Sequence, residues 1–203
     1  MAPARAARSS PDPTPLHHRA LEDLTFIRDT MARAGTVTSV PGWGGVAMGV
    51  TALIASWIAS RQTTGAEWIA VWLGDAVLAL GIGGAAMVRK ADAARTPLLN
   101  RAGKLFVRAF VPPILAGGVL TFVFYQAGLV GRLPGLWLLL YGTAVTVAGA
   151  HSARVVPLLG ISFMVLGSVA FLAPASWGNV LMALGFGGLQ IAFGWLIARR
   201  YGG

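Results

Sequence analysis

Six long apolar stretches constrain the fold of this chain more than any other feature. They cover approximately residues 43–60, 67–88, 105–130, 133–150, 154–174 and 177–197. Each can cross a hydrocarbon core about 30 Å thick at about 1.5 Å per residue, and in lipid each must be a helix to pair its own backbone amides. Only 11% of the residues are charged, against about 25% in soluble domains. The sequence predicts an all-α, polytopic transmembrane bundle with six spanning helices.

The basic residues indicate which side of the membrane each loop faces. The net charge of +9 is spread between the apolar stretches rather than along one face, so it fits membrane topology better than a nucleic-acid-binding surface. If the six stretches alternate in direction, Arg61 and Arg132 alone among the 16 Lys and Arg residues fall on the far side. The positive-inside rule then places both termini in the cytoplasm of a bacterium, with the bundle in its cytoplasmic (inner) membrane.

The loop between the second and third stretches, with its flanks, carries a concentration of positive charge. This charge suits anionic lipid headgroups. The residues concerned are Arg89, Lys90, Arg101, Lys104 and Arg108. Membrane lipids are therefore expected partners, together with a protein partner or a second copy of the chain.

The region before the first stretch divides into two parts. Residues 1–15 are rich in Ala, Arg, Ser and Pro, which predicts a disordered cytoplasmic tail. Residues 16–36 place apolar side chains at helical spacing among charged ones, which predicts an amphipathic helix. That helix is too charged to span, so we expect it to lie on the membrane, cover the bundle or bind a partner. The transmembrane domain is expected to cover residues 40–200.

An internal similarity suggests that the bundle arose from repeated hairpins. Residues 74–84 (GDAVLALGIGG) and 178–188 (GNVLMALGFGG) are identical at six of eleven positions, and Gly135, Leu139 and Gly142 provide a fainter copy between them. Chance agreement among Gly, Ala and Leu is the alternative. As repeats, they predict three two-helix hairpins related by an axis along the membrane normal, two of them preceded by an amphipathic helix.

One acid lies well inside an apolar stretch. Asp75 is eight residues beyond Glu67 and so about 12 Å inside the stretch, where an ionisable side chain is costly and indicates function by default. We expect it to be protonated, to reach water through a cavity, or to be hydrogen-bonded by Asn179, Thr143 or Tyr141. The two interpretations are proton or cation coupling and a neutral acid that holds helices together.

Small residues four positions apart predict close helix packing. They occur in the first, second and sixth stretches. The residues expected to pack are Gly45, Gly49, Ala79, Gly83, Gly84, Ala183, Gly187 and Gly188.

The sequence lacks the residues that several kinds of catalytic or metal site require. There is no cysteine, and His17, His18 and His151 are not spaced as metal ligands. No His-Glu-x-x-His motif, rhomboid-type Gly-x-Ser-Gly motif or pair of carboxylates lies within the stretches. We therefore expect neither an enzyme nor a bound metal or cofactor.

Residues 26–31 (FIRDTM) and 40–45 (VPGWGG) resemble the start of a family of small, uncharacterised bacterial membrane proteins with six helices. The resemblance implies the fold and no activity. We expect a non-catalytic accessory, interaction or sensory subunit, because few polar groups could line a solute path. The alternative is a small transporter or channel in which Asp75 is the proton- or cation-coupling residue.

Overall fold

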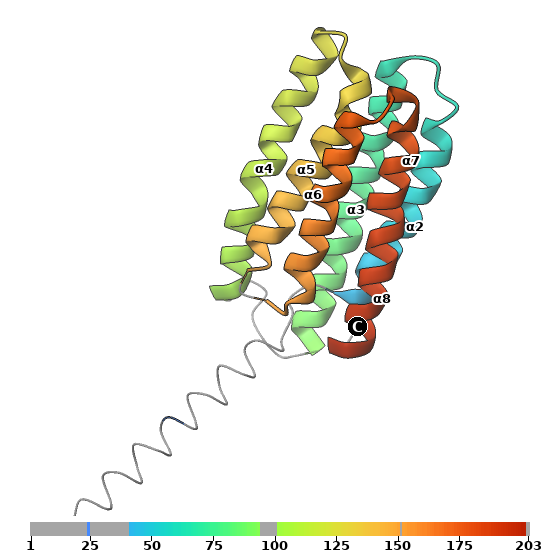
Figure 1. The fold of residues 1–203 in the computed structure, drawn as a ribbon. Helices are drawn as coiled ribbons and strands as arrows, with labels where there is room; N and C mark the ends of the chain where they lie inside the picture. Colours follow the sequence, from blue (N-terminus) through green and yellow to red (C-terminus); the bar gives the residue numbers. More distant parts are fainter. Residues whose placement is uncertain (1–23, 25–40, 94–100, 151, 202–203) are drawn as a thin grey trace, which may run out of the picture. The chain divides into compact units, whose positions relative to one another are not determined.

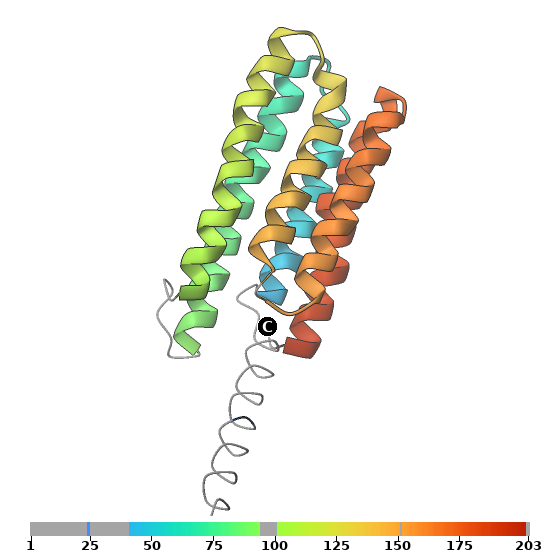
Figure 2. The same ribbon diagram turned by 60° about the vertical axis from the view of Figure 1, so that its left-hand side comes forward.

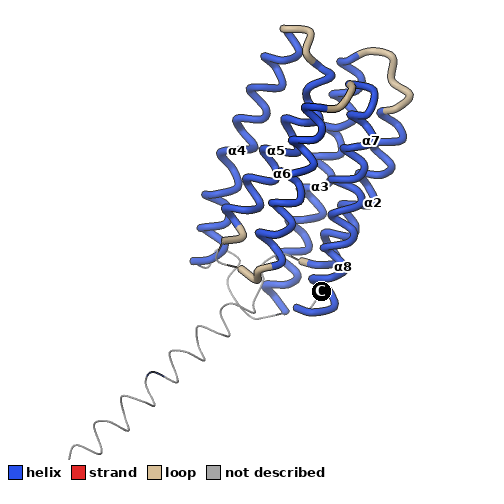
Figure 3. Tube along the Cα trace, in the orientation of Figure 1, coloured by secondary structure: helices blue, strands red, loops and turns tan. Residues whose placement is uncertain are grey.

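The computed structural model describes Leu24 and residues 41–93, 101–150 and 152–201. The described residues from 41 onwards belong to one compact unit. Within the described ranges every regular element is a helix, as Figures 1 and 3 show. The predicted tail 1–15, the amphipathic helix 16–36 apart from Leu24, and the side chain of Arg101 lie outside the described residues.

The predicted all-helical fold with six apolar helices is confirmed. The elements are α2 (Gly42–Ala59), α3 (Gly65–Ala93), α4 (Arg101–Gln126), η1 (Val130–Arg132), α5 (Leu133–Ala148), α6 (Val155–Leu172), η2 (Ala175–Trp177), α7 (Gly178–Met182), η3 (Ala183–Leu189) and α8 (Gln190–Tyr201). Six helical segments of the described chain are long and apolar enough to cross a membrane, and the sixth, Ala175–Tyr201, joins η2, α7, η3 and α8. Their length and composition indicate a multi-pass membrane protein.

Local sequence signals set two of the helix ends. At the start of α3, Thr64 Oγ1 accepts a hydrogen bond from the Glu67 amide and Glu67 Oε2 accepts one from the Thr64 amide, both 3.2 Å long. This reciprocal capping box satisfies two amides of the first turn. At the end of α4, Gly128 has a φ of 72° and Leu129 donates to the Phe124 carbonyl at 2.8 Å. A glycine with positive φ ends α4 at Gln126, short of the predicted residue 130.

The six spans form two layers of three (Figure 2). One layer contains α4, α5 and α6, and the other contains α3, α2 and the sixth span. Neighbours within each layer pack together, and α6 contacts the sixth span at one edge of the bundle. At the other edge, α3 packs mainly on α2, and α4 packs on α5 and η1. The ring of helices therefore lacks an extended contact between α3 and α4.

Glycines allow the closest helix approaches. A Cβ on Gly142 would lie 2.6 Å from the Gly160 carbonyl oxygen, and one on Gly167 would lie 2.7 Å from the Leu139 amide nitrogen. The backbones of α5 and α6 therefore meet without intervening side chains, which maximises dispersion contact between them. Phe163, at 0% exposure, is buried in the core beside this contact.

The glycines expected to pack behave in two ways. Gly45 faces Gly194 in α8, Gly49 faces the Gly187 carbonyl in η3, and Gly83 faces the Met48 sulfur of α2 at 3.3 Å. These positions bring α2 against the sixth span and α3. At Gly84 and Gly188 the described part of the chain shows no such contact, because a Cβ at either would meet none of its atoms within 4 Å.

The first and third copies of the proposed repeat, residues 74–84 and 178–188, lie at different levels along the bundle. Trp68 Nε1 of α3 donates to Asn179 Oδ1 of α7 at 3.2 Å, so these two residues lie at one level. Asp75, which aligns with Asn179 in the sequence comparison, is two turns or about 10 Å further along α3. Asp75 and Asn179 therefore do not lie at one level, because α3 has more than two turns before its copy of the motif and α7 begins at its copy.

Candidate functional site

A cavity of about 440 Å³ lies among the six spans, and we call it the central cavity. Side chains from every span line it, and nearly all of them are apolar. Its polar lining comes from Asp75, Thr121, Tyr141 and Gln190, with the indole N–H groups of nearby tryptophans. A mainly apolar cavity of some 300–1,000 Å³ with a few polar groups is typical of small-ligand sites.

The helices α3 and α4 bound the open side of the central cavity. In the 18-residue apolar part of each helix, 6% of the residues of α3 and 11% of those of α4 are buried, whereas the share is 39–44% in the other four spans. Val77 on α3 and Leu115 on α4 are 71% and 65% exposed, while Ala76 and Ala79 of α3 and Val111 of α4 line the cavity. Ala76 and Val111 are themselves exposed and α3 and α4 lack an extended contact, so the cavity reaches the surface between these two helices.

Aromatic rings form the inner wall of the central cavity. Phe186 is at the centre, with ring centroids 4.9 Å from Tyr141, 5.1 Å from Phe163 and 6.3 Å from Trp72. Tyr141 also meets Phe110 of α4 edge-on at 5.8 Å. Inclined and edge-to-face contacts of this kind are favourable beyond their buried area, so the wall is held in place by its own packing.

A π-helical segment places Phe186 in this wall. The segment is η3, Ala183–Leu189, in the middle of the sixth span. Two glycines of η3 pack closely against neighbouring helices. A Cβ on Gly185 would approach Phe163 of α6 to 3.2 Å, and a Cβ on Gly187 would collide with Leu53 of α2. Single π turns inside α-helices are often found at functional sites, and this one borders the cavity through Phe186.

Most polar side chains around the cavity already have protein partners. Gln190 Nε2 donates to Tyr141 Oη at 2.5 Å. Trp137 Nε1 donates to Thr121 Oγ1 at 3.0 Å, and that hydroxyl donates to the Gly117 carbonyl at 2.7 Å. Because these groups satisfy one another, they fix side chains without making a hydrophilic path.

Asp75 lines the cavity but does not meet the partners expected for it. Its carboxyl group is half-buried and lies near the Thr51 side chain of α2, whose hydroxyl donates to the Met48 carbonyl at 2.8 Å. Asn179 instead bonds Trp68 and Ser56, and Thr143 donates to the Leu139 carbonyl at 2.9 Å. Tyr141 lines the same cavity with Gln190 as its hydrogen-bonding partner. The four predicted residues therefore do not form one hydrogen-bonded cluster in the described part of the chain, although Asp75 and Tyr141 line the same cavity.

Sequence reasoning missed several residues of the site. Gln190 is a polar side chain inside an apolar span, so it carried a usable signal. Trp72 carried none, yet it is 8% exposed, and its indole N–H has no hydrogen-bond acceptor in the described part of the chain. Within the same ranges, no cluster of three His, Cys, Asp or Glu side chains could hold a metal ion.

Comparisons of the chain with protein-family models, with curated proteins and with solved structures find no match.

Proposed function

We propose that this chain is a non-catalytic membrane protein that binds a molecule with an apolar chain in the central cavity, as an accessory, interaction or sensory subunit of the bacterial cytoplasmic membrane. The cavity is the observation that carries the proposal, since its lining is apolar and its side opens between two exposed apolar helices. An apolar molecule dissolved in the bilayer would enter it without crossing water. Transfer of a methylene group from water into such a site contributes about 0.8 kcal/mol of binding free energy. Transfer from lipid contributes less.

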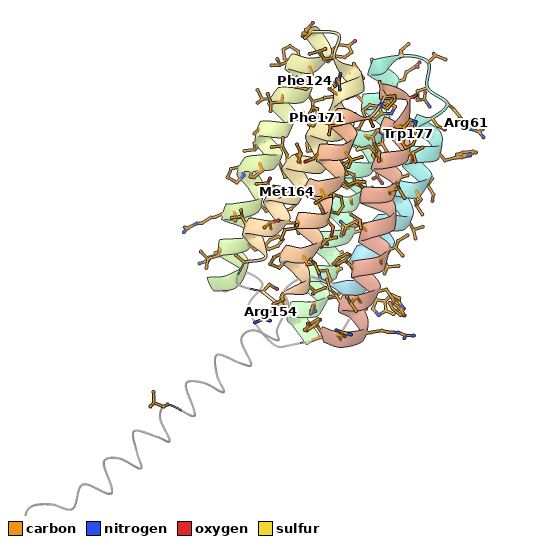
Figure 4. All side chains as sticks on the ribbon, in the orientation of Figure 1. Arg61, Phe124, Arg154, Met164, Phe171 and Trp177 are labelled. Carbon is orange, nitrogen blue, oxygen red and sulfur yellow. The ribbon has the colours of Figure 1, made fainter. Side chains whose placement is uncertain are left out.

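The distribution of charge supports the proposed orientation, with both termini in the cytoplasm. Arg61 and Arg154 lie at opposite ends of the bundle (Figure 4). Arg199 and Arg200 lie in the last turn of α8. They are on the same side as Arg154, because α6 and the sixth span run in opposite directions and the chain returns to the side where α6 began. At the other end, the Arg61 guanidinium lies 3.8 Å over the Trp57 ring, as fits an interfacial aromatic residue.

A photoreactive fatty acid tests the binding function. The purified chain in detergent is irradiated with a 16-carbon acid carrying a diazirine near its chain end, and labelled residues are mapped by mass spectrometry. We expect saturable labelling of cavity residues such as Phe110 and Ala76. Ala79→Phe, which fills the cavity, should abolish it, while Val77→Phe on the exposed face of the same helix should not. Labelling that is unsaturable and equal in both variants would contradict the proposal.

Asp75 favours a second candidate, a small transporter or channel coupled to protons or cations. An acid that lines a cavity in the middle of a span is the observation in its favour, while the apolar lining weighs against it. Reconstituted liposomes distinguish the two. Transport predicts proton or cation flux that Asp75→Asn abolishes without unfolding the chain, whereas the binding function predicts no flux in either protein.

A further inference from the structure

We infer that the molecule bound in the central cavity is an anionic phospholipid, with an acyl chain between α3 and α4 and its headgroup bound by Lys90, Lys104 and Arg108. This inference rests on the proposed function and specifies its ligand. It joins two features of the same pair of helices: an apolar opening and a group of cations at one end of it.

On α4, the cations continue the stripe that lines the cavity. Lys104, Val107, Arg108 and Val111 are spaced three and four residues apart, so they share one face of the helix. Val107 and Val111 line the central cavity, and Lys104 and Arg108 are exposed. On α4, positively charged side chains therefore directly adjoin the apolar lining of the cavity.

On α3, the same transition occurs at the same end of the bundle. Gly83 and Met87 line the cavity, and Lys90 follows Met87 on that face by one turn. The Lys90 side chain is partly buried, and a lysine can bury its methylene stem against apolar surface while keeping its charge. Cations from both helices thus flank the end of the lateral opening.

Within the described part of the chain, no acid is paired with Lys104 or Arg108. Asp92 is the acid at this end of the described chain, and it is exposed. Lys104 and Arg108 have neither a hydrogen bond nor an ion pair from their side chains to another described residue. Basic side chains at a membrane surface each contribute about 1 kcal/mol of attraction to anionic lipid, so the group complements a phosphate headgroup.

The shape of the cavity favours a hydrocarbon chain over a partner helix. Its lining on α3 runs from Trp68 to Met87, which is about 28 Å of helix and nearly the thickness of a hydrocarbon core. The cavity, of about 440 Å³, is therefore elongated along these helices. An α-helix with side chains is about 10–12 Å across and would not fit, whereas an extended acyl chain would.

Brominated lipids provide the test, because bromine quenches tryptophan fluorescence at short range. Trp68, Trp72 and Trp137 line the cavity, so a reference chain would retain these three. The tryptophans replaced by Phe in the reference chain are Trp43, Trp57, Trp177 and Trp195. The reference chain in detergent is titrated with phosphatidylglycerol or phosphatidylethanolamine, each carrying brominated acyl chains.

We expect saturable quenching, with a half-saturating concentration at least tenfold lower for phosphatidylglycerol. Lys104→Gln and Arg108→Gln should each raise that value about fivefold and leave phosphatidylethanolamine unaffected. Arg154→Gln removes a cation at the same end of the bundle but away from the opening, and it should change neither titration.

Other results would overturn the inference in distinguishable ways. Equal binding of the two lipids, blocked by Ala79→Phe and insensitive to the charge variants, would retain an apolar site and reject the anionic headgroup. Displacement of phosphatidylglycerol by millimolar inorganic phosphate would indicate a site for the free ion. A dimer in native mass spectrometry that excludes the lipid would identify a second copy as the occupant. Unsaturable quenching by both lipids would reject the proposed function itself.

Discussion

Asn179 and Ser56 hold two distant spans together through reciprocal hydrogen bonds. The Asn179 side-chain amide donates to the Ser56 carbonyl at 2.7 Å, and the Ser56 hydroxyl donates to the Asn179 carbonyl at 3.1 Å. The Asn179 side-chain oxygen also accepts the Trp68 indole N–H at 3.2 Å. One side chain therefore links α2, α3 and α7 at the same level of the bundle.

Loss of the Asn179 side-chain amide should destabilise this junction. Asn179→Leu leaves the Trp68 N–H without its acceptor. It also removes one of the two hydrogen bonds to the Ser56 carbonyl, which still accepts from the Ser60 amide. We therefore expect the free energy of unfolding to fall by about 1–3 kcal/mol. Ser56→Ala removes a single bond and should cost about 0.6 kcal/mol, the average for such bonds in membranes. Unfolding with dodecyl sulfate in mixed micelles measures both. An Asn179→Leu protein as stable as the original would show that the junction contributes nothing.

Two tryptophans on neighbouring turns of α3 should respond differently to replacement by Phe. Trp68→Phe leaves Asn179 Oδ1 without a donor and should cost about 0.5–1.5 kcal/mol beyond the change in packing. Trp72→Phe removes a buried N–H that has no acceptor in the described residues, so it should cost less than Trp68→Phe. The same micelle titration compares them. A larger loss at Trp72 would mean that its N–H has a partner in the folded protein.

Much of the fold, but little of the site, could be predicted from the sequence. Length and hydropathy are sufficient to locate six spans, because lipid permits few alternatives to a helix. The inward face of each span could not be located, because uniformly apolar helices lack the polar–apolar alternation that marks a buried side. Asp75 was detectable as an isolated acid, yet its contact with Thr51 depends on how α2 and α3 pack. Phe186 is placed by a π-helical turn, and no local sequence pattern predicts that turn.

Glycines at the contact between α5 and α6 should tolerate substitution poorly. A Cβ on Gly142 or Gly160 would lie 2.6 Å from the opposing carbonyl oxygen, so either Gly→Ala change forces the helices apart and should cost about 1–3 kcal/mol. Gly84→Ala and Gly188→Ala are matched controls, since nothing lies within 4 Å of either added methyl group. Thermal unfolding in detergent should separate the two pairs; four equal values would contradict the close contact.

Accessibility labelling tests the proposed orientation. Because the chain has no cysteine, single variants Arg61→Cys and Arg154→Cys each provide one reactive site. A membrane-impermeant maleimide added to intact cells should label the first variant and should label the second only after the membrane is permeabilised. The reverse pattern would place the termini outside the cytoplasm.

The most direct measurement of the central claim is a cryo-EM map of the full chain in nanodiscs containing phosphatidylglycerol, with a bound antibody fragment to aid alignment. We predict α3 and α4 separated by an elongated non-protein density that passes Asp75 and Phe110 and ends near Lys104 and Arg108. Direct packing of α3 against α4, with no density between them, would contradict it.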